Sequence, residues 1–299
     1  MRIFYTDQFV LPLPEGHRFP MAKYALLRER VSAAGLSGGE ALRVPGAARD
    51  EELLRAHDAR YLQRVITGGL EPAEVRAIGF PWTLQMVERS RRSTGATIEA
   101  CRSALENGVA ASLAGGTHHA FRDRGAGYCV FNDAAVAALA MQSEGRVARA
   151  VIVDCDVHQG DGTAMILADD PSVFTFSIHG AGNFPFHKAQ SDLDIALPDA
   201  VGDDAYLSSL SNGLYHAFSA AQPDLAIYLA GADPFEGDRL GRLALSKDGL
   251  ARRDEMVFSL CADLGVPVAV VMAGGYARRI EDSVDIHFNT VRLAATFCK

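Results

Sequence analysis

The sequence predicts a single α/β domain built on an open, mainly parallel β-sheet with helices on both faces. Short apolar segments alternate with longer segments in which apolar residues recur at helical spacing. The short segments are apolar almost throughout, as in parallel strands that helices cover on both sides. No repeat, low-complexity run or charged linker divides the 299 residues, so one domain over 1–299 is expected.

The strands are predicted where β-branched and other apolar residues form short runs. These runs are RIFYTD (2–7), RAVIVD (149–154), SVFTFSI (172–178), DLAIYLAG (224–231) and VPVAVVMAGG (266–275).

The helices are predicted where apolar residues recur at i, i+3, i+4 and i+7, which gives each segment one buried face. Asn132 and Asp133 are suited to begin one of these helices, and Gly145 and Gly265 follow the ends of two. The predicted helical segments are 94–108, 132–145, 202–222 and 250–265.

Composition and charge exclude several classes of protein. The formal net charge is -8, which disfavours nucleic acid as a partner because a nucleic-acid binder needs a basic face. The apolar stretches are too short to cross a membrane, and the opening MRIFYTDQF has no secretory-signal pattern. The five scattered cysteines fit reduced thiols, so a cytoplasmic protein without a membrane partner is expected.

Polar residues gather where the predicted strands end. Asp154 ends one strand, Ser177 to His179 a second, Gly231 to Asp233 a third, and Gly274 to Tyr276 a fourth. Ligands of open parallel sheets bind outside the carboxyl ends of the strands. A functional site is therefore expected at this edge.

The segment DCDVHQGD holds a candidate metal site. Asp154, Asp156 and His158 alternate along it, and on an extended chain they would point to one side. One imidazole and two carboxylates suit a catalytic zinc ion, which takes three protein ligands and leaves a position open. Asp156 and His158 supply two ligands, and Asp233, after another strand, is the candidate third. The alternative is a loop of solvated charges.

Adjacent histidines in LAGGTHHAF are candidates for acid–base chemistry. The ordinary pKa of an imidazole lies near working pH, so His118 and His119 would make a general base and a general acid beside a metal. Each would need a carboxylate to fix its tautomer, and Asp154 and Asp161 are the acids left in the cluster. The alternative is a chance pair or a buried structural histidine.

Tyr276 follows two glycines at the end of a predicted strand. Its phenol could donate a hydrogen bond to an oxyanion that develops on a substrate carbonyl. A structural tyrosine is the alternative.

Taken together, these segments resemble the zinc-dependent histone deacetylase family, of the arginase-deacetylase fold, and most of all its bacterial members close to class IV. The resemblance is carried in order by IGFPWT, LAGGTHHAFRDRGAGYCVFND, DCDVHQGDGTA, FSIHGAGNFPF, GADPFEGDRLGRLALS and MAGGY.

The resemblance implies roles for residues at the strand ends. Asp156, His158 and Asp233 would bind Zn²⁺, or Fe²⁺ in its place, and Tyr276 would polarise the scissile carbonyl. The catalytic histidines would pair with carboxylates, His118 with Asp154 and His119 with Asp161. His119 would be the base, and His118 an acid or an electrostatic aid.

The resemblance also implies a substrate tunnel and a structural potassium ion. Tyr128 and Phe184 would form the walls, Gly127 would face the substrate amide, and Leu240 would lie at the rim. Hydroxamate inhibitors would bind in this tunnel. The potassium site would consist of Asp154, Asp156, His158, Ser177 and Ile178.

The chain departs from the family pattern at three places. Gln159 stands where many members have histidine, and Tyr128 where many have phenylalanine. The acidic residue with which the family anchors its substrate has no match, and neither Glu71 nor Glu74 is assigned to that role.

The expected reaction is hydrolysis of an acyl group, most simply acetyl, from the side-chain amine of lysine. Deacetylation of an acetylpolyamine or another small acylated amine is the alternative, although the apolar Leu240 and the absence of an inserted loop favour lysine. A two-manganese ureohydrolase and a catalytically silent binder are disfavoured by the tandem histidines and by Tyr276. Acyl-chain length, physiological substrate, native metal and oligomeric state stay open.

Overall fold

The computed structural model describes residues 1–36 and 42–298, which form an α/β domain around one eight-stranded sheet. The strand order is β2-β1-β3-β8-β7-β4-β5-β6, and every pairing is parallel. The strands are β1 (Arg2–Phe4), β2 (Leu42–Arg43), β3 (Val109–Ser112), β4 (Ala150–Asp154), β5 (Val173–Gly180), β6 (Leu193–Leu197), β7 (Leu225–Ala230) and β8 (Val268–Met272).

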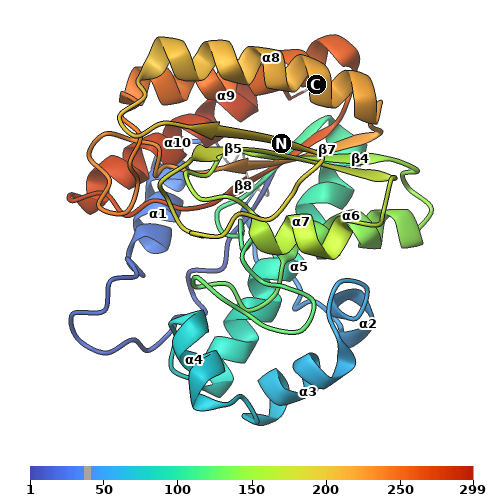
Figure 1. The fold of residues 1–299 in the computed structure, drawn as a ribbon, viewed down its shortest axis with the longest axis vertical. Coiled ribbons are helices and arrows are strands. Elements are labelled where there is room, and N and C mark those ends of the chain that lie inside the picture. The colour runs from blue at the N-terminus through green and yellow to red at the C-terminus, as the bar shows by residue number, and fades with distance from the viewer. Residues whose placement is uncertain (37–41, 299) are drawn as a thin grey trace.

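Helices cover both faces of the sheet, as predicted; Figure 1 shows α8 and α9 on one side and α6 and α7 on the other. One apolar layer joins the sheet to α1 (Lys23–Ala33), α8 (Asp203–Ala221), α9 (Lys247–Leu264) and α10 (Ile280–Thr296). The other joins it to α2 (Asp50–Leu53), α3 (Ala59–Thr67), α4 (Pro72–Ile78), α5 (Leu84–Asn107), α6 (Asp133–Ser143) and α7 (Asp161–Leu167).

The central strands are apolar throughout because both of their faces are covered. Every residue of β3, β4, β7 and β8 is buried, whereas β6 at the edge is mostly half-exposed. Alternation of polar and apolar residues would have placed polar side chains in one of the two apolar layers. The continuous apolar runs in the sequence therefore indicate that these strands are buried on both faces.

The predicted helix ends agree with the structure. The Asn132 side chain accepts a hydrogen bond from the Ala135 N–H and begins α6, and Gly265 ends α9 with a φ of 68°. At such a left-handed position glycine avoids the strain that a Cβ would introduce. Gly145, with a φ of 67°, follows the last turn of α6.

Several predicted boundaries were wrong. The segment 94–108 is only the second half of α5, whose first half is rich in arginine and hides its helical period. Strand β5 continues to Gly180, so Ser177 to His179 lie inside the strand and do not follow its end. Strands β2, β3 and β6 were not predicted from the sequence.

The chain bends after β4, which corrects a second expectation. Residues 155–160 form no strand, so Asp154, Asp156 and His158 do not lie on one extended face. The Asp156 carboxylate instead accepts hydrogen bonds from the His158 backbone N–H (2.9 Å) and interacts with its ring Nδ1 (3.0 Å). Because of this bend, Asp154 points toward His118, whereas Asp156 and His158 lie next to Asp233.

Strands β4, β7 and β8 are neighbours in the sheet, and this places the polar segments that follow them together. Asp154 pairs with Leu229, and Ala230 pairs with Met272, so the three strands end at nearly the same level.

Among the residues 1–36 and 42–298, no helix is long and apolar enough to cross a membrane.

Candidate active site

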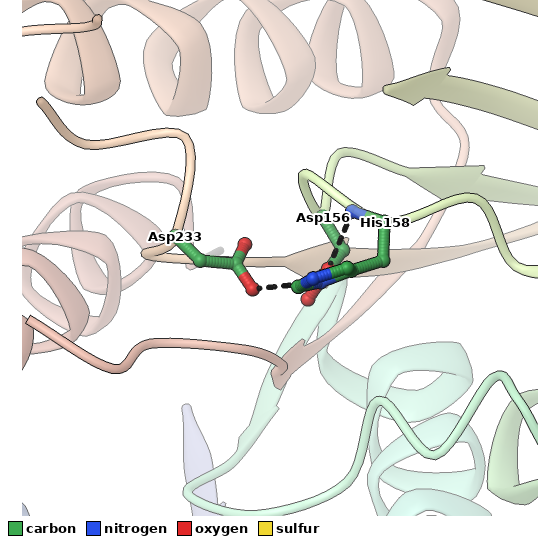
Figure 2. Close-up of side chains that lie close together, drawn as sticks. All are labelled: Asp156, His158 and Asp233. Atoms are coloured by element: carbon green, nitrogen blue, oxygen red, sulfur yellow. Dashed lines mark hydrogen bonds and ion pairs between the residues drawn. The ribbon is translucent and has the colours of Figure 1, made fainter. Parts of the chain in front are cut away.

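Three side chains converge beyond the ends of β4 and β7. Asp156 and His158 come from the bend after β4, and Asp233 from the segment after β7 (Figure 2). One ligand atom from each lies within 4.8 Å of the other two. Both carboxylates are buried, Asp233 completely. The arrangement brings together the three residues that the sequence suggested as metal ligands.

A cation fits the donor set of these three residues. The Asp233 Oδ1 accepts a hydrogen bond from the Val157 N–H (3.0 Å), but its buried Oδ2 accepts none, although it lies 3.3 Å from His158 Nδ1. A buried carboxylate oxygen without a donor is unfavourable, and a divalent cation would satisfy it. Two oxygens and one imidazole nitrogen are ligands that zinc accepts.

Gly274 allows the chain after β8 to lie against both carboxylates. A Cβ at this position would fall 1.8 Å from Asp233 Oδ2 and 2.5 Å from Asp156 Oδ2, so any other residue would displace them. The Gly274 N–H donates to Asp156 Oδ2 over 2.7 Å. Burial and the neighbouring Asp156 charge raise the pKa of Asp233 to about 7. A bound cation would keep both carboxylates ionised.

Two histidine–aspartate pairs lie beside the three ligands. His118 Nδ1 is 2.7 Å from Asp154 Oδ2, and His119 Nδ1 is 2.7 Å from Asp161 Oδ1. The two imidazole centroids are 4.2 Å apart. Each carboxylate can accept the Nδ1 proton and leave Nε2 for chemistry, as in other histidine–carboxylate pairs. His118 Nε2 lies 3.9 Å from Asp156 Oδ1, so this nitrogen faces the candidate metal ligands.

The two histidines differ in their electrostatic surroundings. Burial opposes protonation of His118, but the charges of Asp154 and Asp156 outweigh it and raise its pKa to about 9. Burial and the neighbouring His118 lower the pKa of His119 to about 4. A cation bound to Asp156 would offset part of the charge that favours protonated His118. In the protein alone, His119 is neutral and can accept a proton.

The loop that carries the histidines is fixed by α6. Amide Nδ2 of Asn132 donates to the His118 and Ala120 carbonyls over 3.3 and 3.1 Å. Asp133 accepts hydrogen bonds from the Thr117 N–H (2.7 Å) and the Gly116 N–H (3.1 Å). The sequence predicted Asn132 and Asp133 only as helix-starting residues. Their second role, to hold the loop that carries the histidines, depends on how that loop packs against the helix. No local sequence pattern indicates such a contact.

Tyr276 follows β8, and its backbone is held by Asp238. Carboxylate Oδ2 of Asp238 accepts from the Tyr276 N–H over 2.6 Å, and Oδ1 accepts from the Leu240 and Gly241 N–H groups over 2.8 and 3.0 Å. Burial raises the pKa of the Tyr276 phenol well above its usual range, so the phenol stays protonated. Sequence reasoning missed Asp238, although it lies within the GADPFEGD segment.

The three candidate metal ligands, the two histidines and Tyr276 line one cavity of about 450 Å³. Its wall includes all the residues expected at the substrate tunnel, namely Gly127, Tyr128, Phe184 and Leu240. Gly127 has a φ of 52°, and a Cβ there would lie 2.6 Å from the His119 ring, so glycine is required. Neither Glu71 nor Glu74 is among the residues that line the cavity, but Arg76 is.

Two further expectations concern residues behind the site. Gln159 donates to Asp194 Oδ1 (2.7 Å) and to the Ala189 carbonyl (2.8 Å), so it holds the segment that leads into β6. Ser177 lies opposite Asp154 in the β4–β5 pairing, and its hydroxyl is 2.9 Å from His179 Nδ1. The potassium site that includes Ser177 and Ile178 stays a prediction.

Comparison with known proteins places these features in a wider context. The model of the histone deacetylase domain matches residues 17–291. An uncharacterised protein of Picosynechococcus is 45% identical over 95% of each chain. Histone deacetylase 2 of Arabidopsis thaliana is 31% identical over 95% of this chain and 77% of its own length. A crystal structure of an HDAC homologue complexed with SAHA superposes with a TM-score of 0.87, at 24% identity, over 99% of this chain and 84% of that one.

Proposed function

The chain belongs to the histone deacetylase family, and on that premise we propose that it hydrolyses acyl groups, most simply acetyl, from the side-chain amine of lysine in proteins or peptides. Membership of the family supports a deacetylase activity, and we propose a lysine substrate and a metal ion in addition. One observation carries the proposal: the three possible metal ligands, the two histidines and Tyr276 line one cavity, and each histidine is paired with a carboxylate behind it.

Asp156, His158 and Asp233 are proposed to hold one Zn²⁺ ion, or Fe²⁺ in its place. When bound, the ion would lower the pKa of a water molecule and polarise the substrate carbonyl. Among the residues that the structure describes, these form the one cluster of three possible metal ligands. This favours a single-metal enzyme over a two-manganese ureohydrolase.

The protein groups then divide the proton transfers. Neutral His119 accepts the proton of the attacking water, whose oxygen forms a bond to the carbonyl carbon. The Tyr276 phenol donates a hydrogen bond to the developing oxyanion. Protonated His118 stabilises that negative charge, and an imidazolium returns a proton to the nitrogen as the C–N bond breaks. The products are a carboxylate and a free amine.

The lining of the cavity favours an extended alkyl-amine chain as substrate. Tyr128 and Phe184 line it with aromatic rings, and Leu240 adds an apolar side chain. The Phe184 ring lies 4.9 Å from the His119 ring in an edge-to-face arrangement, so an acyl-lysine passing Phe184 would reach the base. An acetylpolyamine carries further cationic amines, and among the residues that the structure describes the lining offers no carboxylate other than Asp156 and Asp233.

Two further features belong to the same proposal. Hydroxamates are expected to bind, since a homologue of this fold was crystallised with the hydroxamate SAHA. A structural K⁺ ion is proposed at Asp154, Asp156, His158, Ser177 and Ile178, where Ser177 lies opposite Asp154 in the sheet. Buried thiols at Cys101, Cys129, Cys155 and Cys261 are in keeping with a reducing compartment such as the cytoplasm.

A substrate comparison tests the proposal. The zinc-loaded protein is assayed with an acetyl-lysine peptide and with N-acetylputrescine. Faster turnover of the peptide is expected. Hydrolysis of N-acetylputrescine alone would assign the enzyme to small acylated amines, and release of urea from a guanidine substrate would contradict the proposed reaction.

A further inference from the structure

Two arginines line the mouth of the cavity. Arg76 lies in the last turn of α4, and Arg242 lies two residues after Leu240; both side chains are exposed. They come from segments far apart in the sequence. The exposed aromatic rings of Phe184 and Phe186 belong to the same lining.

Arg76 is held beside the tunnel wall by the residues that follow it. The Ala77 carbonyl accepts a hydrogen bond from the Gly127 N–H (3.0 Å), and the Ile78 carbonyl accepts one from the Tyr128 N–H (2.7 Å). The end of α4 is therefore attached to the tunnel wall. Arg76, Tyr128 and Phe184 line the same cavity, so a substrate in it shares the cavity with the Arg76 side chain.

The guanidinium of Arg76 is available to a ligand. No carboxylate in the described part of the chain lies within ion-pair distance of it. The nearest acid in sequence, Glu74, is already engaged: its Oε1 accepts from Arg64 (2.8 Å), and its Oε2 accepts from the Glu71 N–H (2.9 Å). An exposed cation without a partner at the opening of an active site can take an anionic group of the substrate.

Arg242 has a fixed backbone and an exchangeable side chain. Its N–H donates to Asn183 Oδ1 (3.1 Å), and Asn183 donates to the Leu240 carbonyl (2.8 Å). Its Nη1 is 3.2 Å from Asp199 Oδ2, and the two side chains are 55% and 53% exposed. An ion pair as exposed as this one contributes little to stability, so a substrate carboxylate can replace Asp199 as the partner of Arg242.

The charged side chains that line the mouth itself are cationic. Among the cavity-lining residues in the described part of the chain, the only carboxylates belong to Asp156 and Asp233, both at the candidate metal site. The third cation, Lys23, is buried and bonded to the Ala273 and Gly275 carbonyls (3.3 and 3.4 Å). The chain as a whole carries a net charge of -8, so a cationic opening runs against its overall charge. Such an opening concentrates anions and repels polyamines.

We propose that Arg76 and Arg242 bind a carboxylate on the amine side of the substrate, so that the enzyme prefers acyl-lysines with a carboxylate close to the acylated side chain. The inference rests on the proposed lysine deacylase function. Guanidinium groups suit this task because they bind carboxylates through two parallel hydrogen bonds. The carboxylate could be the α-carboxylate of free acyl-lysine or the side chain of a neighbouring Asp or Glu in a peptide.

Matched substrates separate these two sources. The first pair is Nα-formyl-Nε-acetyl-lysine and its α-carboxamide; the second is an amidated acetyl-lysine peptide with aspartate or asparagine next to the lysine. With the zinc-loaded protein, we expect a kcat/KM about 10-fold higher for the carboxylate member of at least one pair, as for hydrogen bonds to charged groups. A preference in the first pair identifies the α-carboxylate, and one in the second identifies an acidic neighbour.

Variants assign the preference to the arginines. Arg76→Gln and Arg242→Gln should each reduce the preference for the carboxylate substrate, and the double variant should abolish it. The matched control is Arg252→Gln on α9, whose side chain is 51% exposed and lies 3.7 Å from Asp204. The control should keep the full preference. High salt should weaken the preference in the unaltered protein.

Two results would overturn the inference, and they are distinguishable. Equal kcat/KM within both substrate pairs, or a preference that survives in the double variant, would refute it while the deacylase function stands. Failure of the zinc-loaded protein to hydrolyse any of the four acetyl-lysine compounds would refute the proposed function and the inference together.

Discussion

The carboxylate of Asp238 accepts a hydrogen bond of 2.6 Å from the backbone N–H of Tyr276. Its second oxygen accepts from the N–H groups of Leu240 and Gly241. One buried side chain thus fixes both the tyrosine proposed to stabilise the oxyanion and the rim of the cavity. We infer that Asp238 is a positioning residue that acts through Tyr276.

Asp238→Asn should therefore lower kcat on an acetyl-lysine peptide. The variant keeps the size of the side chain but loses one acceptor oxygen, and a hydrogen bond to a charged group contributes about 1.5–3 kcal/mol, or roughly 10- to 100-fold. A double-mutant cycle tests whether Asp238 acts through Tyr276. In a Tyr276→Phe background, Asp238→Asn should lower kcat much less. Asp204→Asn, at a 98% exposed side chain on α8, is the control. Fully additive losses would show that Asp238 does not act through Tyr276.

Tyr276→Phe should abolish the proposed oxyanion contact and leave the fold intact. Loss of one oxyanion donor lowers kcat by about 10²- to 10³-fold, equivalent to roughly 3–4 kcal/mol. Steady-state kinetics on the same peptide measure it, with thermal unfolding as a check on folding. Turnover close to that of the unaltered protein would remove Tyr276 from the mechanism.

Asp161→Asn should impair the proposed base. The Asp161 carboxylate lies 2.7 Å from His119 Nδ1, and an amide in its place can present an N–H to that nitrogen and reverse the tautomer. In a serine protease the equivalent change lowers kcat by about 10⁴-fold, and we expect at least about 10²-fold here. Asp123→Asn, at an exposed carboxylate in the loop that carries His119, serves as the control. If both variants turned over equally well, the pair His119–Asp161 would not contain the base.

The sequence predicted the fold class, and it pointed to side chains that the structure places close together, because both depend on local pattern and on a general property of parallel sheets. The runs before Asp154, Gly231 and Gly274 are apolar since β4, β7 and β8 are buried on both faces. Once such strands are adjacent, the residues after them must meet at one edge.

The remainder depends on contacts between segments far apart in the chain. Asp238 acts on a backbone N–H 38 residues away, and Asn132 on the carbonyl of His118, 14 residues before it. Arg76 reaches the cavity only because the end of α4 is bonded to Gly127 and Tyr128. The local periodicity of the sequence does not indicate such contacts. The bend after Asp154 was missed for the same reason.

His57 should make the folded protein sensitive to acid. Its Nδ1 is 2.9 Å from the Phe121 carbonyl, its Nε2 accepts from the Asn132 N–H (2.9 Å), and burial lowers its pKa to about 4. The unfolded chain takes up this proton near pH 6.5, before the folded chain does. The contribution of His57 is therefore complete above about pH 6.5 and declines as the pH falls toward 4, by about 1.4 kcal/mol per pH unit.

Urea unfolding at pH 7 and pH 5 measures this effect. Between these values the unaltered protein should lose about 2 kcal/mol of unfolding free energy through His57, and His57→Gln should lose that much less. The control is His216→Gln, at an exposed histidine of α8, which should behave as the unaltered protein does. An identical pH dependence in His57→Gln would show that His57 is not the group responsible.

Metal content and turnover, measured on the same sample, test the central claim most directly. The chelator-treated protein is titrated with Zn²⁺ while hydrolysis of an acetyl-lysine peptide is followed, in parallel with Asp233→Asn. We predict that one equivalent of zinc per chain restores hydrolysis, and that Asp233→Asn neither retains the metal nor recovers activity. Hydrolysis that persists after chelation and in Asp233→Asn, or a requirement for two metal ions per chain, would contradict the account.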